Sequence, residues 1–130
     1  MNNMKNAYQS TSLRANISSS TTTVGTIVDL AGFVEVGKRN LKLIVGIVDC
    51  KLTTTTDQTI AVTWYESDTT LSSEGTAISG AAVSSGTTVG SLNEYNVLAT
   101  KRYVFASAFA TGTVPAWGVI ASVIATRRTW

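Results

Sequence analysis

Two long apolar runs near the end of the chain predict a pair of β-strands. Residues 101–110 read Lys-Arg-Tyr-Val-Phe-Ala-Ser-Ala-Phe-Ala, and residues 117–126 read Trp-Gly-Val-Ile-Ala-Ser-Val-Ile-Ala-Thr. Aromatic and β-branched residues dominate both runs, and Gly112 and Pro115 between them favour a turn. A helix is the alternative, but Gly118 and the β-branched residues of the second run argue against it. The pattern therefore predicts a β-hairpin.

Both faces of this predicted hairpin are apolar. Strand alternation places Val104 and three alanines on one face of the first strand, and Tyr103, Phe105, Ser107 and Phe109 on the other. A sheet with one face in water alternates apolar with polar residues. We therefore expect the second face to be covered by another layer, another subunit or a partner. An interior strand pair within one sandwich explains the pattern equally well.

Further strands are predicted where short apolar or alternating runs are bounded by turn residues. They lie at residues 26–30, continuing at 33–36, and at 41–48, 59–67, 76–79 and 87–89. Residues 93–98 then lead into the hairpin. About seven or eight short strands with regular turn signals predict an all-β fold, an antiparallel β-sandwich of jelly-roll-like architecture.

The first 25 residues break this pattern. They are mostly asparagine, serine and threonine with scattered apolar residues. Such a segment is too polar to form a core element, so residues 1–25 are predicted to be a flexible N-terminal arm that is extended when docked. Residues 26–130 are predicted to form the β-sandwich domain. A terminal segment without any function is an equally good interpretation.

Composition narrows the classes of function. Charged residues make up 14% of the chain, against about 25% in an average protein, and hydrophobic residues 44%. The net charge of +2 is too small to indicate nucleic-acid binding, and no apolar run is long enough for a membrane helix. The polar first residues do not resemble a secretion signal, so we expect synthesis in the cytoplasm.

Catalytic and metal-binding chemistry is poorly represented. The chain has no histidine, and its one cysteine, Cys50, stands beside Asp49 without a base to activate it. Glu66 and Asp68 point to the same side of a strand end, which is half of a calcium site but more often a solvated end. We therefore expect no enzymatic activity, no metal and no cofactor.

Two groups of residues are candidates for binding. The aromatic side chains could stack on sugars or anchor a protein interface, although core packing accounts for most of them. They are Trp64, Tyr65, Tyr95, Tyr103, Trp117 and Trp130. Pairing across Gly112 would also bring four cations to one edge, where they could dock on an acidic surface or simply be solvated. They are Lys101, Arg102, Arg127 and Arg128.

Several of these segments together resemble the small decoration, or cement, proteins of tailed bacteriophages. The resemblance covers roughly residues 28–128 and rests on short motifs of structural residues. They are Val-Asp-Leu-Ala-Gly-Phe (28–33), Leu-Lys-Leu-Ile-Val-Gly-Ile-Val (41–48), Val-Thr-Trp-Tyr-Glu-Ser-Asp (62–68), Thr-Lys-Arg-Tyr-Val (100–104) and Gly-Val-Ile-Ala-Ser-Val-Ile-Ala (118–125). One departure is that Phe105 and Phe109 occupy a face that is usually more polar in such proteins, which suggests an oligomer contact.

The resemblance implies a β-sandwich that binds and stabilises the outside of an icosahedral capsid, often as a trimer, with the major capsid protein as its partner. We accordingly expect a virion protein on the capsid exterior, with Phe105, Phe109 and Trp117 at the oligomer interface and the four cations on the shell. Two alternatives stay open: a carbohydrate- or receptor-binding module of a virion, which would need Trp64 or Trp117 exposed in a shallow groove, and a head–tail or tail-tube component.

Overall fold

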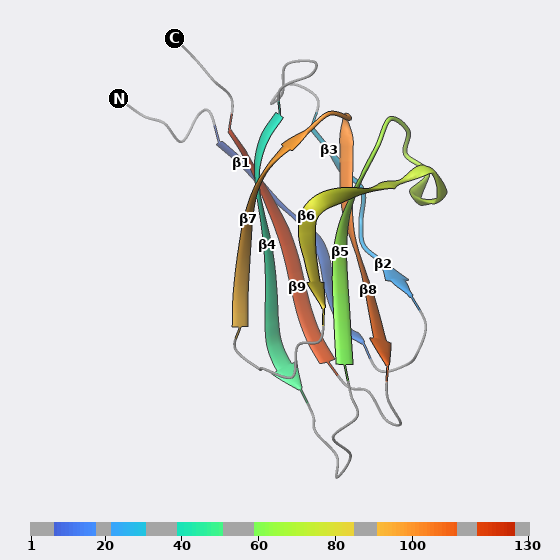
Figure 1. The fold of residues 1–130 in the computed structure, drawn as a ribbon, viewed down its shortest axis with the longest axis vertical. Helices are drawn as coiled ribbons and strands as arrows, with labels where there is room; N and C mark the ends of the chain where they lie inside the picture. Colours follow the sequence, from blue (N-terminus) through green and yellow to red (C-terminus); the bar gives the residue numbers. More distant parts are fainter. Residues whose placement is uncertain are drawn as a thin grey trace.

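A computed structural model describes residues 7–17, 22–30, 39–50, 59–84, 91–111 and 117–126. These residues form two antiparallel sheets packed face to face (Figure 1). In chain order the strands are β1 (Ala7–Ile17), β2 (Thr23–Val24), β3 (Val28–Asp29), β4 (Arg39–Cys50), β5 (Thr59–Ser67), β6 (Thr76–Ser84), β7 (Ser91–Ala99), β8 (Tyr103–Thr111) and β9 (Trp117–Thr126). A short 3-10 turn, η2 (Ser72–Glu74), lies between β5 and β6. The predicted all-β sandwich is confirmed.

The strand order is that of a jelly roll. Sheet A has the order β1-β9-β4-β7, and sheet B has the order β2-β8-β5-β6, with β3 also paired to β8. Because β2 and β3 lie along the same side of β8, they act as one interrupted strand, and each layer is effectively four-stranded. Apart from β2 with β3, which act as one strand, and β5 with β6, strands that follow one another in the described sequence lie in different sheets. This alternation between layers is typical of jelly rolls.

The predicted hairpin between the last two strands is wrong. β8 pairs with β5, β2 and β3 in sheet B, whereas β9 pairs with β1 and β4 in sheet A. The strand spans themselves agree with the prediction. Both strands are interior members of their sheets, and in each of them one face lies in the core between the sheets while the other points outward.

The predicted N-terminal arm is also wrong for residues 7–17. They form β1, which pairs with β9 from Ala7 opposite Thr126 to Ile17 opposite Trp117. Leu13 and Ile17 are 4% and 2% exposed and belong to the core. A polar composition is compatible with this position because β1 is an edge strand with one face in water. A boundary at residue 25 therefore does not separate an arm from the sandwich; residues 1–6 and 18–21 lie outside the described residues.

Alternation in the other strands places the core between the sheets. In β5 the side chains of Ile60, Val62 and Trp64 are fully buried, as predicted, and in β4 Leu43, Val45 and Ile47 are equally buried. The inner face of β8 consists mostly of alanine, and Ala106 lies directly beside Trp64 in the ladder. Small residues beside a large one allow the two layers to interdigitate.

A buried serine joins the two sheets at one side of the sandwich. The register of β1 shifts between Thr11 and Leu13, which makes Ser12 a bulge residue with 4% exposure. Its hydroxyl donates to the Thr26 carbonyl (2.7 Å) and accepts from the Ala106 amide (2.9 Å), while the Thr26 amide donates to the Ser12 carbonyl (2.6 Å). The hydroxyl thus satisfies a β8 amide at the gap between β2 and β3, where the ladder is interrupted.

Gly25 is required at this junction by the close approach of two backbones. Its amide donates to the Ala106 carbonyl at 2.8 Å. A Cβ atom at this position would lie 2.6 Å from both oxygen atoms of Ser12 and 2.9 Å from the Ala106 carbonyl oxygen. These distances are too short for any side chain, so the junction depends on a residue without one.

At the opposite side, β6 is the edge strand of sheet B. The predicted strand at 76–79 is its beginning, and the predicted strands at 33–36 and 87–89 lie outside the described residues. β6 loses register with β5 between Thr63 and Tyr65, which pair with Ala82 and Ala77, so several residues of β6 bulge opposite one of β5. Within this bulge Gly80 has a φ of 77°, a conformation that favours glycine. Figure 1 shows β6 curving strongly at this edge.

Candidate interaction surfaces

The turn that leads into β8 carries two of the four predicted contact cations, and both are paired within the chain. The Arg102 guanidinium donates two hydrogen bonds to the Asp29 carboxylate, at 2.8 and 2.9 Å. These hydrogen bonds, reinforced by the charge of Asp29, raise the pKa of Arg102 above its already high ordinary value. The guanidinium carbon also lies 5.1 Å from the centre of the Tyr103 ring. Arg102 thus ties the start of β8 to β3.

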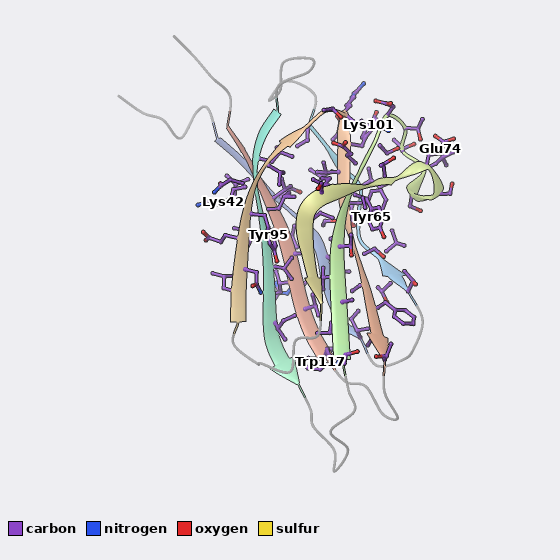
Figure 2. The ribbon with its side chains drawn as sticks, viewed as in Figure 1. Lys42, Tyr65, Glu74, Tyr95, Lys101 and Trp117 are labelled. Carbon is purple, nitrogen blue, oxygen red and sulfur yellow. The ribbon has the colours of Figure 1, made fainter. Side chains whose placement is uncertain are left out.

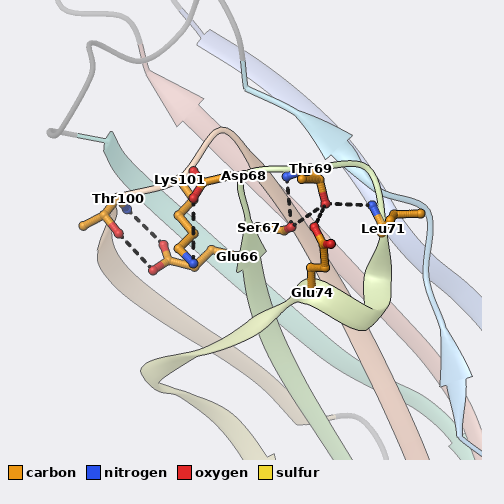
Figure 3. A network of polar contacts seen from close by, with 8 residues as sticks. All are labelled: Glu66, Ser67, Asp68, Thr69, Leu71, Glu74, Thr100 and Lys101. Atoms are coloured by element: carbon orange, nitrogen blue, oxygen red, sulfur yellow. Dashed lines mark hydrogen bonds and ion pairs between the residues drawn. The ribbon is translucent and has the colours of Figure 1, made fainter.

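The neighbouring contacts fix the same end of the sandwich (Figure 3). Lys101 forms an ion pair with Asp68 at 4.0 Å. The Glu66 carboxylate accepts hydrogen bonds from the amide and the hydroxyl of Thr100, at 2.9 and 3.0 Å. The two carboxylates considered for a calcium site therefore bind groups of the turn at 100–101. No group of three or more potential metal ligands occurs among the described residues.

The structure describes two of the four residues of the predicted cationic edge, Lys101 and Arg102. Lys101 and Arg102 each form an ion pair with a carboxylate, so their positive charges are largely neutralised within the chain. Arg127 and Arg128 lie outside the described residues and follow β9, which is in the other sheet from β8. Strand pairing across Gly112 does not bring the four cations together. A role for them in shell binding stays a prediction.

The predicted oligomer-interface residues are placed in three different environments. Trp117 points into the core and is 1% exposed, and Phe105 is on the outer face of sheet B yet 2% exposed. Phe109, on the same outer face, is 38% exposed. Only Phe109 can therefore contact another molecule without rearrangement of the chain. Val24, 46% exposed, is beside it, because Val24 pairs with Ser107, two residues before Phe109.

Phe105 is covered by the chain's own connection between β5 and β6. Its ring stacks on Tyr65, with centroids 5.3 Å apart and planes 11° from parallel. A Cβ atom at Gly75 would lie 2.5 Å from the tip of the Phe105 ring, so the connection is in direct contact with it. The Thr69 amide donates a hydrogen bond to the Ser67 hydroxyl, and the Thr69 hydroxyl donates one to the Glu74 carboxylate; these bonds hold the connection in place (Figure 3). This contact explains why an outward-facing aromatic is buried.

The outer face of sheet A carries an apolar surface that the sequence pattern did not single out as a site. Ile44, Ile120, Ile124 and Leu92 all point outward there; we call them the sheet A patch. The isoleucines are half-buried and Leu92 is 64% exposed. The ladder places Ile120 beside Gly46 and Gly46 beside Leu92, so the patch crosses three strands. The sequence signal was present in the alternation of β4 and β9, but without the pairing it could not be assembled into one surface.

Polar residues border the sheet A patch on both sides. On the β1 side Arg14 is exposed and pairs with Ile120. On the β7 side Glu94 is exposed and forms an ion pair with Lys42 at 3.5 Å. Ser122 lies in the centre, 7% exposed, with its hydroxyl 3.2 Å from that of Thr11. The face therefore has a largely apolar centre, a cation on the β1 edge and, on the β7 edge, an anion that is ion-paired with Lys42.

The two core tryptophans remove the basis for one alternative function. Trp64 and Trp117 are 0% and 1% exposed, so neither can stack on a sugar in a shallow groove. The indole N–H of each has no acceptor among the described residues. Figure 2 labels Trp117 among side chains that lie between the layers. In the described part of the chain, no helix has the length and apolarity needed to cross a membrane.

Comparison with known proteins connects this fold to virus structures. No protein-family model and no curated protein matches the sequence. The chain is similar to a chain in the structure of infectious bursal disease virus strain Gx, with a TM-score of 0.55, 16% identity and coverage of 92% of this chain. For strain Gt the TM-score is 0.56, the identity 13% and the coverage 93%. This chain spans 31% of the length of those chains. At such identities the similarity establishes a shared jelly-roll fold.

Proposed function

We propose that this protein is a structural component of a virus particle, and specifically a decoration protein that binds and stabilises the outer surface of a tailed-phage capsid. The observation that carries the proposal is the fold: nearly the whole chain superposes on about a third of a chain from a virus structure. Jelly rolls occur in viral capsids, lectins and cupins. The motif resemblance to decoration proteins favours the first of these.

The described side chains support a scaffold role. The carboxylates Asp29, Glu66 and Asp68 each bind a group of the same chain and fix one end of the sandwich. The outer surfaces, in contrast, carry apolar residues such as Leu92 and Phe109. Exposed apolar surface of this kind is typical of proteins that function in an assembly. A lectin-like function is less well supported, because both candidate tryptophans are buried.

A second candidate is a subunit that builds the shell itself. The observation in its favour is that the similar structures are chains of virus structures, within which this fold makes up about a third of a longer chain. The two functions differ in what the purified chain does alone. A shell subunit assembles into closed particles, whereas a decoration protein stays small and binds to shells made of another protein.

The test uses the full chain and empty shells assembled from the major capsid protein of the same virus. We expect the chain to co-sediment with the shells, to appear as density on their outer surface by cryo-electron microscopy, and to raise their melting temperature. Absence of binding to intact shells would overturn the decoration function. Closed particles formed by the chain alone would establish the second candidate in its place.

A further inference from the structure

We propose that the outer face of sheet A is a self-association surface, and that two copies of the chain pack through it about a two-fold axis that runs parallel to the strands. The inference rests on the sheet A patch and on the charges at its edges. It does not depend on the proposed role in a capsid. It also differs from the trimer that the family resemblance implies.

The outer face of sheet A is too apolar to be fully exposed to water, so its composition favours contact with another molecule. Three central outward rows of the ladder are Arg14, Ile120, Gly46 and Leu92; Thr11, Ser122, Ile44 and Glu94; and Ile124, Lys42 and Asn96; a further row has Asn16 beside Gly118. The middle strands β9 and β4 thus present isoleucine, glycine and serine, with one lysine. A solvated face would carry polar residues at these positions. The polar residues are instead at the edges, which is the arrangement of an interface with an apolar centre and a polar rim.

The size of the face fits a dimer. Sheet A has four strands, and β9 has ten residues. With strands about 4.8 Å apart and about 3.4 Å per residue, the face measures roughly 19 by 34 Å. This corresponds to roughly 650 Å² before the relief of the side chains is included. Stable interfaces bury about 800 Å² on each partner, so a second copy covering the whole face reaches the usual size.

Charge placement selects the symmetry. Arg14 is on edge strand β1, and Glu94 is on the opposite edge strand β7. A two-fold axis parallel to the strands places β1 of one copy over β7 of the other. Arg14 of one copy then lies over the row of Leu92 and one row, about 7 Å, from Glu94 of the second copy, within reach of a long side chain.

The other two-fold arrangement is disfavoured by the same charges. An axis in the interface but perpendicular to the strands would place β1 over β1 and β7 over β7. The two Arg14 side chains would then lie along one shared edge of the interface and the two Glu94 side chains along the other. Like charges across an interface oppose association. A second copy in the first orientation is therefore the occupant whose charges match this face, and it makes the contact twice by symmetry.

The experiment measures the mass of the full chain in solution by sedimentation equilibrium over a range of concentrations. We expect a dimer of twice 13.7 kDa. Ile44→Lys, which places a charge in the apolar centre, is expected to weaken the dimer by about tenfold or more. Arg14→Glu is expected to weaken it as well, and adding Glu94→Arg to that variant is expected to restore much of the loss. Far-ultraviolet circular dichroism verifies that each variant is folded.

The control is Phe109→Asp, which alters the exposed aromatic on the outer face of sheet B. It should leave the dimer intact. A wild-type chain that is monomeric or trimeric would overturn the inference. A dimer that is dissociated by Phe109→Asp but not by Ile44→Lys would also overturn the inference, because that result would place the interface on sheet B. Failure of rescue in the doubly exchanged variant would overturn the proposed axis.

Discussion

Removal of the Ser12 hydroxyl tests the junction that joins the two sheets. In Ser12→Ala, the Ala106 amide loses its acceptor at 2.9 Å and the Thr26 carbonyl loses its donor at 2.7 Å. Ala106 is fully buried, so its amide cannot turn to water, whereas Thr26 is exposed and its carbonyl can be solvated. A buried polar group left without a partner costs about 1–3 kcal/mol. We therefore expect the free energy of unfolding to fall by about 1–3 kcal/mol.

The assay is equilibrium unfolding in urea, followed by the fluorescence of the buried tryptophans and by circular dichroism at one fixed protein concentration. For a chain of this length, each kcal/mol corresponds to roughly 3–5 °C in melting temperature, so a thermal scan should also resolve the change. Ser73→Ala is the matched control, because Ser73 is exposed in η2 and should shift stability by less than about 0.5 kcal/mol. Equal losses in the two variants would refute the role of the Ser12 hydroxyl.

Three further predictions concern the core, the same junction and one tyrosine. Leu43→Ala is expected to cost about 2–5 kcal/mol because Leu43 is fully buried, while the exposed Leu71→Ala should cost little; urea unfolding of both checks this. Gly25→Ala is expected to cost about 1–3 kcal/mol, because its Cβ would force the backbone of Ser12 away; a melting temperature equal to the wild type would contradict this. Burial raises the pKa of Tyr95 above 10.0. Since the unfolded chain then ionises this phenol at lower pH than the folded chain, the stability it contributes is lost as pH rises above about 10, and Tyr95→Phe should make unfolding less pH-dependent in that range.

The strands with strict alternation were predictable from sequence. Residues 59–67 were predicted as a strand and are β5, with Ile60, Val62 and Trp64 inward. Residues 41–48 lie within β4 and bury the predicted face. In both strands one set of alternate positions is occupied by large apolar residues, so the local period determines both the conformation and the buried face. For these two strands, the local sequence pattern was sufficient to predict both the strand and its buried face.

Strand pairing was not predictable from the same information. The Gly112 and Pro115 segment has the composition of a hairpin turn, yet β8 and β9 bind partners in different sheets. β1 was missed because its apolar residues, Leu13 and Ile17, are few and a bulge at Ser12 interrupts its alternation. Which strand lies beside which depends on contacts between residues far apart in sequence, and periodicity contains no information about those contacts.

Because strand pairing was not predicted, the candidate surfaces were not predicted correctly either. The carboxylate partners of Lys101 and Arg102 were not predicted, and that of Arg102, Asp29, lies 73 residues away in sequence. Phe105 was predicted on the correct face and is buried by a connection whose position no pattern indicated. The sheet A patch required the pairing of β4, β7 and β9 to be known. A surface made from several strands can be predicted only when the order of the strands in the sheet is known.

The interior position of β9 in sheet A has a consequence for how the protein is made. Residues 7–17 leave the ribosome long before their pairing partners, residues 117–126, and β4 also needs β9 on one side. Sheet A therefore cannot close until residues 117–126 have been synthesised, and folding dominated by such distant pairings is expected on the millisecond-to-second timescale. During that delay β4, apolar at its centre, has an open edge that can pair with other nascent chains. Chains that terminate before residue 117 lack both β9 and two of the isoleucines of the sheet A patch, so the proposed dimer can form only from chains that contain β9.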